Sequence, residues 1–277
     1  MSVAETGLQA RRCPLDQFAQ NAELYNVTFI ALPFVRRLVS GFVHLKLALE
    51  MGKFLLAAGV GLVAFVLYGR QSFWFPGPTT PSFHVILPSE APVLVNYLDQ
   101  YADKLGDERE GYQNHCLRTL SFAEEFLRAD GWSPAQIAER REVVETALAF
   151  HDIALWSDGA LNYLEPSAKQ AEVKASHLSA EDAALVRDII VQHHKFTPYS
   201  GSADDAVVNA VRKADWVDFT QSAGFCLRSG MPTGNIAEAH AHLPAAGFYD
   251  TLGKMPARHS PDNEFAGVRE VLKIYKW

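Results

Sequence analysis

The sequence predicts an all-α fold, in which a helical domain beginning near residue 93 follows a separate apolar helical segment. From residue 93 onward, apolar side chains recur at the three- and four-residue spacing of amphipathic helices. Over the same range, no stretch sustains the strict alternation of apolar and polar residues that a half-buried strand would show. Prolines gather between residues 76 and 92, and we interpret this stretch as the linker between the two parts.

The composition fits a folded domain and argues against a nucleic-acid polymer as the main partner. The chain has 277 residues, 48% of them hydrophobic, which allows one well-packed domain plus an extra segment. Its net charge of −7 is opposite in sign to the basic face that nucleic-acid binding needs. Cys13, Cys116 and Cys226 are widely spaced and form no CxxC motif, so we expect free thiols in a reducing compartment.

The first 75 residues divide into a polar tail, residues 1–26, and an apolar and amphipathic helical segment, residues 27–75. Residues 54–69 carry no charge, and as a helix they would span about 24 Å, less than the ~30 Å hydrocarbon core of a bilayer. Basic and apolar residues are mixed ahead of this run, as in helices that lie on a membrane surface. We expect a cytoplasmic domain with membrane association through residues 51–75. The alternative is a buried hairpin of two apolar helices.

The domain of residues 93–277 follows the proline-rich linker of residues 76–92, and capping signals bound its expected helices. Gly131 is a typical helix stop, and Ser133 with Pro134 provides an N-cap and a first-turn proline for the next helix. Ser179, followed by acidic residues, opens another helix. The expected helices cover residues 93–104, 112–130, 134–152, 181–195 and 204–219.

Histidine and aspartate side chains occur within these helices or at their ends. The set comprises His115, His151, Asp152, His193, His194 and Asp215. Imidazole and carboxylate groups are the ligands that hold hard and borderline divalent metal ions. Adjacent residues of a helix point about 100° apart, so His151 and Asp152 can share a metal only at a helix end or an irregular turn. We expect that break before Gly159, and the sequence therefore predicts a metal centre between helices.

The order His115, His151–Asp152, Asp215 resembles the HD-domain superfamily of metal-dependent phosphohydrolases, over roughly residues 93–277. His115 is trailed by Arg118, as in the first motif of that family, and Lys213-Ala214-Asp215 is similar to its last motif. The second motif departs in one place, because Ala154 stands where the family often has glycine. The resemblance implies an HD-type helical bundle that binds a divalent ion (Mn, Mg, Ni, Co, Zn or Fe) through His115, His151, Asp152 and Asp215.

The resemblance also implies a reaction, the hydrolysis of a phosphoester of a nucleotide or another small phosphorylated metabolite by metal-activated water. Asp152 would act in catalysis and could bridge to a second metal ion. His193 is expected to bind that second ion, and His194 to protonate a leaving group or hydrogen-bond Asp152. Arg118, Lys195 and Lys213 are candidate phosphate contacts. The alternative for Arg118 is a structural ion pair, and the alternative for Lys195 is a solvated side chain.

Other functions fit the same residues. Some HD-fold proteins resemble myo-inositol oxygenase and use a mixed-valent di-iron pair, and His177, His193 or His194 would supply the additional ligands. A hydratase or lyase with one zinc ion on the same fold is a related alternative, and a sensory module with a vestigial site is a non-catalytic one. Trp156 and Tyr163 flank the loop after His151–Asp152, the HD pair, and are our candidates for the pocket lining. Weaker candidates, or residues expected at the surface, are Glu165, His177, Asp218, His240, His242 and His259.

Overall fold

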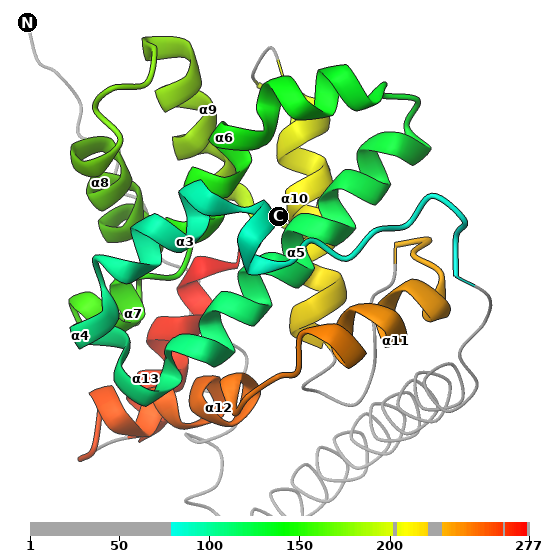
Figure 1. Ribbon diagram of the computed structural model, residues 1–277. Helices are drawn as coiled ribbons and strands as arrows, with labels where there is room; N and C mark the ends of the chain where they lie inside the picture. Colours follow the sequence, from blue (N-terminus) through cyan, green and yellow to red (C-terminus); the bar gives the residue numbers. More distant parts are fainter. Residues whose placement is uncertain (1–78, 202–203, 221–228, 263, 276–277) are drawn as a thin grey trace, which may run out of the picture. The chain divides into compact units, whose positions relative to one another are not determined.

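The computed structural model describes residues 79–201, 204–220, 229–262 and 264–275. All regular secondary structure in these residues is helical. The all-α prediction is therefore confirmed for this part of the chain (Figure 1). The expected apolar segment of residues 27–75 lies outside the described residues. Within them, no helix combines the length and the apolar character that crossing a membrane requires.

The α-helices follow one another through short connections, with short 3₁₀ turns between some of them. They are α3 (Pro92–Asp99), α4 (Ala102–Leu105), α5 (Arg109–Ala129), α6 (Pro134–Phe150), α7 (Ala154–Ser157), α8 (Leu164–Lys174), α9 (Ala180–Gln192), α10 (Asp205–Phe219), α11 (Thr233–His242), α12 (Phe248–His259) and α13 (Glu264–Val271). The expected helix of residues 93–104 is divided into α3 and α4. Helices α7, α8, α11, α12 and α13 were not expected.

Helix α5 is the central element of the bundle, and most of its residues from Gly111 to Leu127 are buried. It packs most extensively on α10 and also on α6, while α9 packs on α6 and α8 (Figure 1). Small and branched apolar side chains of α10, such as Val207, Val211 and Ala214, are buried in the core of the bundle. The packing brings His115 on α5 next to Asp215 on α10.

Local capping explains where two of these helices begin. The Ser133 hydroxyl accepts a hydrogen bond from the Gln136 amide at 3.3 Å, and the Gln136 side chain accepts one from the Ser133 amide at 3.0 Å. This capping box satisfies two amides that the first turn of α6 leaves unpaired. Ser179 accepts from the Asp182 amide at 3.1 Å and begins α9 in the same way. Both N-caps were expected from the sequence.

Helices α12 and α13 pack against each other, and α12 also contacts α5 (Figure 1). Their apolar side chains join a second, smaller core with the residues that follow the HD pair. This core comprises Ala154, Leu155, Leu161, Tyr163, Leu164, Met255 and Ile274. The C-terminal helices therefore close one end of the bundle, next to the HD pair.

Candidate metal centre

The HD pair lies at a break between two helices. Helix α6 ends at Phe150, residues 151–153 form a turn, and α7 begins at Ala154. His151 is fully buried and Asp152 is 4% exposed. The expectation that the pair needs a helix end or an irregular turn is confirmed, and the break lies at residues 151–153, before Gly159 as expected. In this turn both side chains reach the same space.

A first group of potential ligand atoms comes from His115, His151 and Asp152, with Asp215 beside them. The Nε2 atoms of His115 and His151 are 3.0 Å apart, and Asp152 Oδ2 is 3.3 Å from His151 Nε2. Asp215 Oδ1 lies 3.4 Å from His115 Nε2 and 3.8 Å from His151 Nε2. These are the four residues that the HD-like order singles out, and α5, α6 and α10 bring them together.

A second group adjoins the first and shares its carboxylates. It comprises Asp152, His193 and His194, the two histidines coming from the end of α9. Asp152 Oδ1 is 3.3 Å from His193 Nε2, and Asp215 Oδ2 is 3.6 Å from His194 Nδ1. Each aspartate thus directs one oxygen to each group. From the sequence we expected only His193 to be a ligand, but the turn that ends α9 brings both His193 and His194 close to Asp152.

Three histidine rings are oriented by hydrogen bonds from their Nδ1 atoms. His151 Nδ1 donates to the Leu148 carbonyl and His193 Nδ1 donates to the Ile190 carbonyl, both at 2.7 Å. His115 Nδ1 makes the same kind of bond to Asp218 Oδ2, also at 2.7 Å. A proton on Nδ1 leaves the Nε2 lone pair available as a ligand, which is how metal-binding histidines are commonly held.

Burial keeps two of the imidazoles neutral. It lowers the pKa of His151 to about 4 and that of His194 to about 3. Burial also disfavours ionised carboxylates, but the histidines that face Asp152 and Asp215 outweigh it and hold the pKa of both carboxyl groups below the usual range. Neutral imidazole and ionised carboxylate are the forms that bind cations.

The other two imidazoles are drawn toward the charged form by carboxylates. Burial opposes protonation of His115, but Asp215 and Asp218 outweigh it and raise the pKa of His115 to about 9. Burial is likewise outweighed at His193, where Asp152 raises the pKa. A cation bound at Nε2 would replace these protons, because a metal ion and a proton compete for the same lone pair.

Unpaired buried atoms indicate that these residues fit a metal ion. Among the described residues, Asp152 Oδ1, His193 Nε2, His194 Nδ1 and Asp215 Oδ2 are buried and have no hydrogen-bond partner. Buried polar atoms without partners are costly, and native structures contain few of them. They form two facing pairs, Asp152 Oδ1 with His193 Nε2 at 3.3 Å and Asp215 Oδ2 with His194 Nδ1 at 3.6 Å, and a bound cation would give such atoms a partner. The buried His and Asp groups could therefore hold a metal ion.

Arg118 is linked to His115 through the carboxylate of Asp218. Its side chain is fully buried, and it donates to Asp218 Oδ1 at 2.6 Å, to Asp218 Oδ2 at 2.8 Å and to the Leu243 carbonyl at 2.8 Å. The structure thus places Arg118 against a carboxylate and a carbonyl, not at the cavity described below. Asp218, a weaker candidate from the sequence, is the residue that joins Arg118 to His115. Its position three residues after Asp215 on α10, which puts both on one helix face, is the signal that could have identified it.

The remaining candidates lie apart from the two groups. Lys213 Nζ is 3.8 Å from Asp130 Oδ2, and the Lys195 carbonyl accepts a hydrogen bond from Arg212. His177 is exposed and pairs with Glu142, as expected of a surface residue. His240 was also expected away from the site, but its Nε2 lies 3.4 Å from Asp218 Oδ1.

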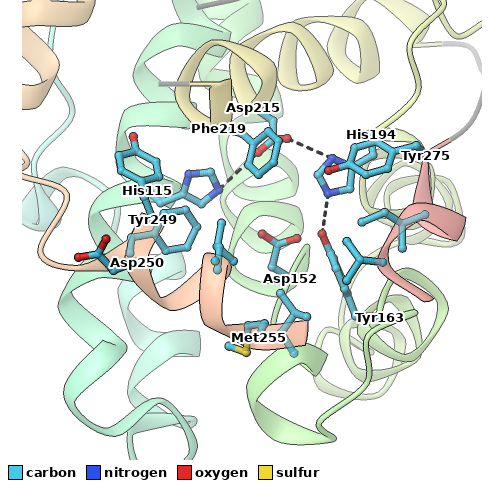
Figure 2. A pocket seen from close by; sticks show the side chains of 16 residues that line it. His115, Asp152, Tyr163, His194, Asp215, Phe219, Tyr249, Asp250, Met255 and Tyr275 are labelled. Carbon is cyan, nitrogen blue, oxygen red and sulfur yellow. Dashed lines mark hydrogen bonds and ion pairs between the residues drawn. The ribbon is translucent and has the colours of Figure 1, made fainter. Parts of the chain in front are cut away.

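A cavity of about 320 Å³ opens onto the centre (Figure 2). Its polar floor is formed by His115, Asp152, His194 and Asp215. Its walls come mainly from α12 and the C-terminal residues, and they include Phe248, Leu252, Met255, Val271, Ile274 and Tyr275. Tyr163 lines the cavity as expected, whereas the Trp156 indole donates to Glu108 at 2.6 Å and is not among the lining residues that the structure describes. Arg118, Lys195 and Lys213 are not among them either.

No family model matches the chain, and comparison with curated proteins and with solved structures found no match.

Proposed function

We propose that this protein is a metal-dependent hydrolase with a two-ion centre. The observation that carries the proposal is the position of Asp152, which belongs to both groups of potential ligand atoms and directs one oxygen to each. Two ions that share a carboxylate are a recurring arrangement in phosphoester hydrolysis, where both oxygens of an in-line displacement are stabilised. The HD-like order of the same residues supports this reaction class.

A bound divalent ion would polarise a phosphoryl oxygen and lower the pKa of water, which supplies a nucleophile near neutral pH. The residues of the chain hold the geometry for this chemistry. The carboxylates of Asp152 and Asp215 would offset the positive charge of the two ions. The carbonyls of Leu148 and Ile190 hold the rings of His151 and His193 in their orientation. The apolar walls lower the local polarity around the floor of the cavity, which strengthens electrostatic interactions there.

The substrate in this proposal is a small phosphoester. The cavity lies near the lower end of the 300–1,000 Å³ range of ligand pockets, so a compact metabolite fits better than a long one. Among the lining residues that the structure describes there is no lysine or arginine. The negative charge of a phosphoryl group would therefore be met mainly by the ions, and Arg118 acts through Asp218 and His115.

Metal analysis followed by a phosphate-release screen tests the proposal. Purified protein would be loaded with Mn, Ni, Co, Mg, Zn or Fe and assayed against a panel of phosphorylated metabolites. We expect His151→Ala and Asp152→Ala to lower the rate of phosphate release at least 100-fold. His177→Ala, which changes an exposed histidine, is the matched control. Full activity in both site variants would overturn the proposal.

A second candidate function, a di-iron oxygenase, is favoured by the number of histidines at the centre. His193 and His194 lie in the sequence interval where such HD-fold enzymes have additional ligands, and both face Asp152 or Asp215. Two irons per chain together with oxygen consumption would support this candidate. Phosphate release that depends on Mn, Ni, Co or Mg would support the hydrolase.

A further inference from the structure

Tyr163 lies beside the proposed two-ion centre, and its hydroxyl belongs to neither group of potential ligand atoms. It directly precedes α8, is 5% exposed and lines the cavity (Figure 2). Its Oη atom is 2.6 Å from His194 Nε2, the shorter of the two dashed contacts of His194 in Figure 2. The phenol therefore stands between a potential ligand and the space where a substrate would bind.

The two nitrogens of His194 determine which way the Tyr163 hydroxyl points. His194 Nδ1 is 3.6 Å from Asp215 Oδ2 and is the atom that belongs to the second group. When Nδ1 binds a cation, the ring hydrogen of a neutral imidazole must be on Nε2. Nε2 then donates to the Tyr163 oxygen, and the single hydrogen of the hydroxyl is left for another acceptor.

The surroundings of Tyr163 contain few acceptors for that hydrogen. Asp152 is one of them and forms a side-chain hydrogen bond with Tyr163, but ions bound at both groups would occupy the two oxygens that Asp152 directs to His151 and His193. Nearby cavity walls are hydrocarbon, including Leu155, Met255 and Ile274. With both ions bound, the open volume of the cavity is the place where a further acceptor can lie.

We propose that the Tyr163 hydroxyl donates a hydrogen bond to an oxygen of the bound substrate, and that His194 fixes the hydroxyl in this direction. The inference rests on the proposed function, since it assumes a phosphoryl group above the two ions. Tyr163 would then be a catalytic residue that contacts the substrate. It would also favour substrates that place an acceptor oxygen near His194, opposite the hydrocarbon wall.

Binding of inorganic phosphate to the Mn²⁺-loaded full chain tests this role without any measurement of turnover. We expect Tyr163→Phe to weaken phosphate binding roughly tenfold to 100-fold in isothermal titration calorimetry, as for loss of a hydrogen bond to a charged group. The Mn²⁺ content per chain should be unchanged. Tyr101→Phe is the matched control, because Tyr101 packs against Phe150 and is not among the described lining residues. Tyr163→Met is a second variant for the case in which Tyr163→Phe does not fold.

Three results would overturn the role of Tyr163. The first is that Tyr163→Phe binds phosphate as tightly as the wild type. The second is that the variant loses Mn²⁺, so that its phosphate binding falls for that reason. The third is that the Mn²⁺-loaded wild type binds no phosphate. Failure of the proposed function gives a different result. Phosphate would then bind in a Tyr163-dependent manner, but no phosphoester would be hydrolysed.

Discussion

Asp218 accepts a hydrogen bond from His115 Nδ1 at 2.7 Å, and Arg118 holds the same carboxylate through bonds of 2.6 and 2.8 Å. All three side chains are buried. Burial opposes ionisation of Asp218, but the Arg118 guanidinium outweighs it and keeps the pKa of that carboxyl well below its usual range. The buried charge on Asp218 therefore fixes the orientation of His115 and increases the basicity of its free nitrogen.

We expect Asp218→Asn to weaken divalent metal binding by about 10-fold to 100-fold, the usual cost of altering such an outer partner. The asparagine oxygen can still accept from His115, but the negative charge is lost. Titration of Mn²⁺ into the protein by calorimetry measures the effect. Because Arg118 would be left buried without a counter-charge, we also expect the free energy of unfolding to fall by about 3–5 kcal/mol.

Asp99→Asn is the control for this change, since it removes an aspartate that pairs with Arg109 at the surface. It should leave the Mn²⁺ affinity unchanged. If Asp218→Asn bound Mn²⁺ as tightly as the wild type, Asp218 would have only a structural role.

The number of ions bound distinguishes Asp152 from His193. Asp152 belongs to both groups, so we expect Asp152→Ala to lose high-affinity binding of both ions. His193 belongs only to the second group, so His193→Ala should keep one ion and lose the other. Elemental analysis after gel filtration gives the stoichiometry, with His177→Ala as the surface control. Retention of two ions in His193→Ala would contradict the assignment of the second group.

Some of this centre could be predicted from the sequence because its signals are local. A helix break near His151 and the cap at Ser133 depend on a few neighbouring residues each, and each motif that carries His115, His151, Asp152 or Asp215 is short. The hydrogen bond between Tyr163 and His194, which are 31 positions apart, depends on how α8 and α9 pack. The same holds for Arg118 and Asp218, 100 positions apart. No local pattern encodes such pairs, and the sequence therefore left Arg118 open between a phosphate contact and a structural ion pair, of which the structure shows the ion pair.

The apolar walls lead us to expect a preference for phosphoesters with an apolar body. Phenyl phosphate and ribose 5-phosphate carry the same reacting group, but only the first can bury an apolar ring against Leu252 and Met255. Burial of apolar surface contributes about 25 cal/mol per Å², so 60–100 Å² would correspond to at least a tenfold difference. We expect phenyl phosphate to be the tighter ligand or the better substrate by this factor.

Leu252→Asn tests the cause of that preference, because it places an amide in the apolar wall at similar volume. The preference for phenyl phosphate over ribose 5-phosphate, measured as the ratio of their affinities or rates, should fall several-fold. Leu272→Asn is the same exchange at a residue that is 60% exposed, and it should leave the ratio unchanged. A wild-type protein that prefers ribose 5-phosphate would show that the walls do not select the body of the substrate.

The pH dependence of stability should report the link between Glu108 and Arg258, which holds α12 beside the cavity. Glu108 accepts hydrogen bonds from Arg258 at 2.6 and 3.0 Å and from the Trp156 indole at 2.6 Å. The bond from Arg258 is the main reason that the pKa of Glu108 lies below the ordinary value of 4.5. A carboxyl group whose pKa is lowered by folding stabilises the folded state above its unfolded pKa, and this contribution is lost as the pH falls through the folded value.

We therefore expect Glu108→Gln to lower the free energy of unfolding by about 0.2–1 kcal/mol at pH 7, as for a partly exposed ion pair. The difference from the wild type should shrink below pH 4.5. Urea unfolding at several pH values measures it, with the exposed Glu110→Gln as control. A constant difference at all pH values would mean that the ion pair is not the cause.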